Sequence, residues 1–143
     1  MLIRAGRLDE AIARGREAVA AAAALTPPHP ISAYAHAMLG EALLQSGQAA
    51  EALPLLQRAL AQREQLLPAE HPVRLNSLSL VGAAQAAAGD RVAGLERMRQ
   101  AAERLQATLG ATHEFTQRAH ARIARYAPDA ARADAATPQP LRR

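Results

Sequence analysis

A repeat of 42 residues constrains this 143-residue chain more than any other feature. The pair His29-Pro30 recurs as His71-Pro72 after 42 residues, and His113-Glu114 follows after another 42. Self-similarity at a fixed period of this length is the signature of a solenoid, in which similar units stack in a row. The other residues that recur in this register are Gly6, Gly47 and Gly89, and Leu25, Leu67 and Leu109.

Each unit predicts two helices joined by a tight turn. The His-Pro pair opens the first helix, because proline suits the first helical turn, where its missing N–H costs nothing. Glycine closes that helix, since it readily adopts the positive φ common at helix ends. Apolar residues spaced three and four apart, such as Leu53, Leu56 and Leu60, then mark the second helix. The predicted helices are Leu8–Leu25, Ile31–Ser46, Ala49–Leu67, Val73–Ala88, Arg91–Leu109 and Glu114–Tyr126.

Composition points to an all-α fold. Alanine supplies 38 residues and leucine 19, whereas valine and isoleucine together number eight and aromatic residues three. Alanine favours helix, while the β-branched and aromatic residues that suit strands are scarce. The chain is therefore predicted to contain helices and no sheet.

Charge, aromatic content and cysteine content exclude several functional classes. The net charge of +4 comes entirely from residues 90–143. Three aromatic residues are too few for the base-stacking surface of a nucleic-acid-binding protein, so no nucleic-acid partner is predicted. Without cysteine there is no disulfide, thiol catalysis or thiolate zinc site. No run of 18 apolar residues predicts a membrane span, and we expect a cytoplasmic protein.

The repeated histidines are predicted to be turn residues that hydrogen-bond the backbone. Their spacing places each one repeat from the next, about 10 Å by the diameter of a helix, whereas the ligands of one zinc ion lie ~2 Å from it. His113-Glu114 begins like the zinc-protease motif, but Gln117 stands at the second ligand position. Neither a nucleophile elbow nor a phosphate-binding glycine loop occurs. We predict no enzymatic activity, no metal and no cofactor.

The repeat resembles the tetratricopeptide repeat of the long, kinesin-light-chain type, whose units run about 42 residues instead of the common ~34. Leu39-Gly40-x-x-Leu43 stands where the family has Leu-Gly-x-x-Tyr, and Ala52-x-x-x-Leu56 where it has Ala-x-x-x-Phe. The next copy, with Val81-Gly82 and Gly94-x-x-x-Met98, matches less closely. The segment LLPAEHPVRL is similar to the turn between such repeats. The resemblance covers roughly residues 6–126 and implies an α-α superhelix of antiparallel helix pairs.

This register predicts the domain organisation. A helical repeat domain is expected over residues 1–127, followed by a disordered tail over 128–143, which has almost nothing to bury. Within the domain we expect a partial repeat over 1–28, full repeats over 29–70 and 71–112, and a capping helix over 113–127.

The resemblance also implies that the first helix of each pair lines a concave groove for a protein or peptide. Arg118, Arg122 and Arg125 form one stripe on the last helix, and guanidinium groups at this spacing bind carboxylates. The prediction is an acidic ligand, with neutral hydrogen bonds from Asn76 and Ser79. The same stripe also suits a terminal cap, which is expected to be polar. The predicted groove residues are Tyr34, Met38, Glu41, Gln45, Asn76, Ser79, Leu80, Arg118, Arg122 and Arg125.

Two functions remain open at this stage. The chain is expected to be a non-catalytic binding scaffold, or alternatively the C-terminal regulatory or interaction segment of a larger bacterial signalling protein such as a serine/threonine kinase. The first predicted helix lacks a partner before it, which favours a piece of a larger protein or self-association through residues 1–25. On this interpretation Leu8, Ile12 and Val19 form an apolar stripe that a single neighbouring helix leaves partly uncovered.

Overall fold

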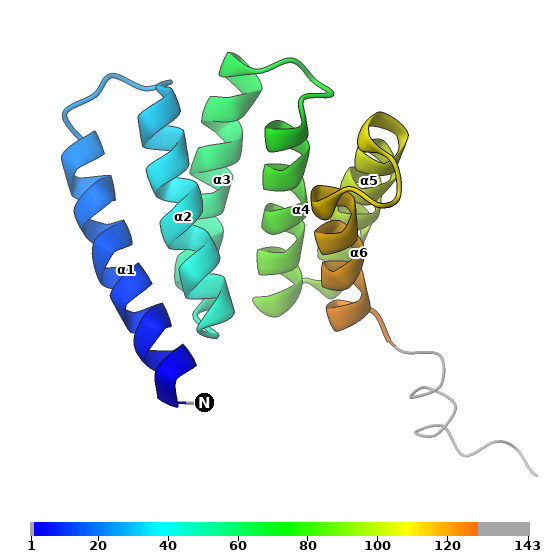
Figure 1. Ribbon diagram of the computed structural model, residues 1–143, viewed down its shortest axis with the longest axis horizontal. Helices are drawn as coiled ribbons and strands as arrows, with labels where there is room; N and C mark the ends of the chain where they lie inside the picture. Colours follow the sequence, from blue (N-terminus) through cyan, green and yellow to red (C-terminus); the bar gives the residue numbers. More distant parts are fainter. Residues whose placement is uncertain (1, 129–143) are drawn as a thin grey trace, which may run out of the picture.

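The computed structural model describes residues 2–128, with side chains from Gly6 onward, and these residues form six helices in a row (Figure 1). No strand occurs among them, and consecutive helices pack against each other, so the predicted all-α superhelix of antiparallel helix pairs is confirmed. The predicted disordered tail lies, from residue 129 onward, outside the described residues. The helices are α1 (Leu2–Ala22), α2 (Pro30–Gln45), α3 (Ala49–Leu66), α4 (Pro72–Ala87), α5 (Arg91–Leu109) and α6 (Glu114–Tyr126).

The helix boundaries follow the repeat except in α1. Helices α5 and α6 have the predicted bounds, and α2, α3 and α4 differ from them by one residue at one or both ends. Gly47 and Gly89 end the first helices with φ values of 85° and 116°, as predicted. The predicted span Leu8–Leu25 is wrong, because α1 begins at Leu2 and continues through Gly6. A glycine that forms no turn is tolerated inside a helix at a cost of about 1 kcal/mol.

Each repeated histidine caps the helix that follows it. The Nδ1 atom accepts a hydrogen bond from the backbone N–H two residues further on, at 3.1 Å for His29, 3.1 Å for His71 and 3.0 Å for His113. These bonds satisfy one of the N–H groups that a helix start leaves without a partner. The predicted role, a turn residue that hydrogen-bonds the backbone, is confirmed at all three positions.

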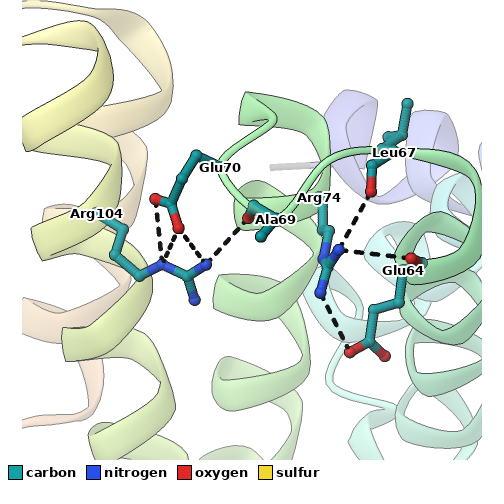
Figure 2. A network of polar contacts seen from close by, with 6 residues as sticks. All are labelled: Glu64, Leu67, Ala69, Glu70, Arg74 and Arg104. Atoms are coloured by element: carbon teal, nitrogen blue, oxygen red, sulfur yellow. Dashed lines mark hydrogen bonds and ion pairs between the residues drawn. The ribbon is translucent and has the colours of Figure 1, made fainter.

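Two arginines fasten the turn between α3 and α4 (Figure 2). Arg104 of α5 donates from Nη2 to the carboxylate of Glu70 at 2.6 Å and to the carbonyl oxygen of Ala69 at 3.0 Å. Arg74 of α4 donates from Nη1 to the carbonyl oxygen of Leu67 at 3.1 Å. The hydrogen bond from Arg104 lowers the pKa of the Glu70 carboxyl. The turn is thus held by α4, which it precedes, and by α5.

The apolar stripe of α1 is covered by α2. Ile12 is only 8% exposed and packs in one cluster with Leu39 and Leu43 of α2, and Val19 packs against the same cluster. Leu8 is half-buried. The prediction that this stripe stays partly uncovered is therefore wrong for Ile12, because α2 closes over it.

Candidate functional site

The six helices form an inner and an outer layer. We call α2, α4 and α6, which follow the capping histidines, the first helices, and α1, α3 and α5 the second helices. Helix α4 contacts both α2 and α6, whereas α3 and α5 do not contact each other. Neighbouring repeats therefore approach most closely through their first helices, which line the concave side.

A hollow of about 490 Å³ opens between the three first helices. We call it the inner hollow. Six of the ten predicted groove residues line it: Glu41 and Gln45 from α2, Leu80 from α4, and Arg118, Arg122 and Arg125 from α6. The other lining residues are Leu44, Ala83, Ala121 and Tyr126. Three arginines against one glutamate leave this surface positively charged.

Arg122 is the fixed positive charge of the inner hollow. Its Nη1 donates to Asn76 Oδ1 and to Ser79 Oγ, both at 3.0 Å and both across from α6 to α4. Burial lowers the pKa of Arg122, the charge of Glu41 opposes that shift, and Arg118 adds to it. The guanidinium nevertheless remains protonated, since arginine does not lose its proton in proteins.

This geometry corrects the role predicted for Asn76 and Ser79. Ser79 is fully buried, so its hydroxyl faces Arg122 and not the groove surface. Asn76 is half-buried and its carbonyl oxygen accepts from the same nitrogen. Both side chains orient the guanidinium instead of offering free hydrogen bonds to a ligand.

The other two arginines of the stripe are exposed and make weaker internal contacts. Arg118 forms an ion pair with Glu114 one turn earlier on α6. The guanidinium of Arg125 lies 5.7 Å from the ring centre of Tyr126, a cation–π distance. Exposed pairs of this kind contribute little to stability, so both side chains can turn toward a ligand at small cost.

Tyr34 and Met38, the remaining predicted residues, lie elsewhere on α2. Tyr34 is 60% exposed and lines a second hollow of about 320 Å³ beside the capping residue His71. Met38 is 42% exposed and lines neither hollow.

Sequence reasoning missed two contributors to these hollows. Arg63, at the end of α3, lines the second hollow and donates from Nη1 to Ser77 Oγ at 2.7 Å, and burial lowers its pKa. Tyr126 lines the inner hollow although its sequence pattern placed it on the packing stripe of α6. A signal for Tyr126 was present, since it follows Arg122 by four residues and so shares its side of the helix.

The described residues offer no catalytic or metal-binding cluster. Among them, no three histidine, aspartate or glutamate side chains gather to hold a metal ion. The search for long apolar helices within residues 2–128 also finds none that could cross a membrane.

Comparisons with known proteins agree with this architecture. Residues 1–65 match the family described as tetratricopeptide repeat. A crystal structure of "putative kinesin light chain nearly identical TPR-like repeats" from Podosopora anserina matches with a TM-score of 0.72 and 28% identity, over 85% of this chain and 58% of that one. A variant of the same protein matches with a TM-score of 0.73 and 29% identity, over 85% and 57%. The chain thus spans less than three fifths of either structure's length. No curated protein matches the chain.

Proposed function

We propose that this chain of tetratricopeptide repeats, of the kinesin-light-chain type, is a non-catalytic scaffold that binds an acidic protein or peptide segment in its inner hollow. Repeats of this fold generally serve in protein–protein interaction, because stacked units create an extended concave surface. The observation that carries the proposal is the arrangement of Arg122 between Asn76 and Ser79 on the floor of the hollow. A guanidinium already held in place loses less side-chain freedom when a carboxylate binds to it.

The rim of the hollow supports the same ligand class. Arg118 and Arg125 lie one turn before and one turn after Arg122 on α6, so three cations face one region of bound ligand. Glu41 is the single acidic side chain in the lining, and Gln45 offers neutral hydrogen bonds. Each exposed charge contact is worth only about 0.2–1 kcal/mol, so useful affinity requires several of them to act together.

A binding measurement with defined peptides tests the proposal. The probe is a fluorescently labelled oligo-glutamate peptide, with the oligo-glutamine peptide of equal length as its neutral counterpart. Anisotropy is expected to show tighter binding of the glutamate peptide at low salt and a loss of affinity as salt rises.

Paired variants locate the binding surface. The double variant Arg118→Ala with Arg125→Ala leaves Arg122 and its partners in place and is expected to weaken binding several-fold. Its matched control, Arg91→Ala with Arg97→Ala, removes two exposed arginines from α5, in the outer layer. Equal losses in the two double variants, or equal binding of both peptides, would contradict the proposal.

A second candidate function is that of a regulatory or interaction segment in a larger bacterial signalling protein such as a serine/threonine kinase. The observation that favours it lies on α1. Ala11 is exposed there, whereas its repeat equivalents Ala52 and Gly94 are buried under the first helices α2 and α4. An immunoblot of the native source separates the two candidates, because the scaffold predicts a band at 15.1 kDa and the segment a much larger one.

The same exposed position supports self-association as a further part of the proposal. A second helix whose first-helix side is uncovered presents a surface that another helix can bury. Through this face, and not through the stripe of Ile12, we expect copies of the chain to associate at high concentration.

A further inference from the structure

We infer that copies of this chain associate head to tail, with α6 of one copy packing on α1 of the next as its missing first helix. This inference deepens the self-association proposed above and rests on it. The two helices lie at opposite ends of the row of helices (Figure 1). Such a contact joins two different surfaces, so it can continue from copy to copy.

The first observation is that α1 lacks the cover its equivalents have. In each complete pair, the first helix buries two small positions of the second helix. These are Ala52 and Ala59 in α3, each 0% exposed, and Gly94 and Ala101 in α5, also buried. The corresponding residues of α1 are Ala11, which is exposed, and Ala18, which is half-buried. We call Ala11 and Ala18 the open face of α1.

The second observation is that α6 lacks the cover its own equivalents have. Ala124 is exposed, whereas Gly40 and Gly82 at the same repeat position are buried. Ile123 is half-buried, whereas Leu39 and Val81 are 3% and 0% exposed. We call Ile123 and Ala124 the open face of α6. It is the side on which a second helix packs in the complete pairs.

The third observation is that residue sizes on the two open faces match each other. In the complete pairs a first-helix glycine meets a large side chain: a Cβ at Gly40 would lie 2.6 Å from Leu56 Cγ, and a Cβ at Gly82 2.9 Å from Met98 Cγ. Along α1 the position of Leu56 and Met98 is taken by Gly15. The first helix α6 has Ala124 where the others have glycine. The methyl group added on α6 therefore meets a residue of α1 that lacks a side chain.

Packed in this way, α6 and the next copy's α1 form a third helix pair like α2–α3 and α4–α5. The junction continues the packing already present within the chain, so the superhelix passes from one copy into the next. Gly15 also lets α1 approach α2 closely, since a Cβ there would lie 3.1 Å from Leu39 Cβ. One small residue thus serves both neighbours of α1.

The absence of cysteine allows a clean cross-linking test. Ala11→Cys and Ala124→Cys are made in separate chains, because the equivalent residues Gly94 and Gly82 touch in the α4–α5 pair. Under mild oxidation, the mixture of the two variants is expected to give a mixed disulfide. Ala13→Cys replaces Ala11→Cys in the control, since Ala13 and its equivalents Pro54 and Glu96 are all exposed, and it is expected to cross-link poorly. Circular dichroism confirms that each variant folds.

Sedimentation of the unmodified chain measures the assembly itself. Mass is expected to rise with concentration beyond that of a dimer, and Ala11→Arg, but not Ala13→Arg, is expected to abolish the rise. If the chain associates but Ala11→Cys pairs with itself, self-association stands and the head-to-tail contact is overturned. A monomer at all concentrations without a mixed disulfide overturns both. A longer native chain in which a preceding helix protects Ala11→Cys from thiol reagents overturns the head-to-tail contact.

Discussion

Gly82 and Gly94 touch where α4 and α5 pack, so closely that a Cβ on Gly82 would lie 2.7 Å from the carbonyl oxygen of Gly94. A Cβ on Gly94 would in turn lie 2.5 Å from the carbonyl oxygen of Gly82. Neither obstacle is a flexible side chain, so the two backbones must separate to admit even one methyl group. The pair therefore fixes how closely the two helices of the second full repeat approach.

This contact predicts that Gly82→Ala destabilises the protein. Overpacking of this kind costs about 1–3 kcal/mol, which lowers the denaturation midpoint. The matched control is Gly6→Ala within α1, where no heavy atom lies within 4 Å. That change is expected to stabilise by about 0.5–1 kcal/mol, since alanine suits a helix better than glycine. Equal midpoints for the two variants would show that the contact carries no strain.

The histidine caps predict a specific pattern of rescue at His71. Replacing His71 by alanine removes the acceptor of the Val73 N–H and is expected to cost about 1 kcal/mol. Replacing it by asparagine is expected to preserve most of the stability, because asparagine is a good helix cap. Chemical denaturation of the three proteins measures the difference. If alanine and asparagine are equally harmful, the imidazole acts through packing instead of capping.

The contact between Glu70 and Arg104 predicts an acid-sensitive contribution to stability. The hydrogen bond from Arg104 lowers the pKa of Glu70 in the folded protein, so the unfolded chain takes up the proton first. The stabilisation is therefore present above the ordinary carboxyl pKa and is lost as pH falls through the lowered one. Glu70→Gln is expected to be less stable than the unmodified protein near pH 7 (about neutral), with the difference vanishing at strongly acid pH. A constant difference at every pH would assign the effect to something other than the charge.

The anchoring of Arg122 predicts a larger structural effect there than at its neighbour on the stripe. Arg122→Ala leaves Asn76 Oδ1 and Ser79 Oγ without their shared donor and is expected to cost about 1–3 kcal/mol. Arg118→Ala removes an exposed pair and is expected to change stability by less than about 0.5 kcal/mol. Thermal unfolding compares the two. Similar midpoints would mean that the buried guanidinium is no better anchored than the exposed one.

Most of the fold was predictable because the repeat supplies three copies of one local pattern. The register of His29, His71 and His113 located the start of each first helix, and Gly47 and Gly89 located the ends. Gly6 shares that register but lies inside α1, because a glycine permits a turn without requiring one. Helix boundaries at the end of a repeat therefore depend on what packs nearby, which a local pattern does not contain.

The candidate site was predictable only in part, for a reason that Arg122 makes plain. Its place on the concave side followed from the repeat, and so did those of Asn76 and Ser79. That the three bind one another depends on the distance between α4 and α6, and residues 43 and 46 positions apart carry no local signal of it. The hollow beside Tyr34 was missed for a similar reason, because Arg63 reaches it from α3.

The row of helices has one last consequence. Within the described residues, each helix packs only on helices at most two places away along the chain, so nothing ties α1 to α5 or α6. Stability in such a stack is a profile along its axis and not a single value. Amide hydrogens of α1 should exchange with solvent through opening of that helix alone, whereas those of α4, which contacts four of the other five helices if α2 and α6 are counted with its direct neighbours, should wait for a far larger opening.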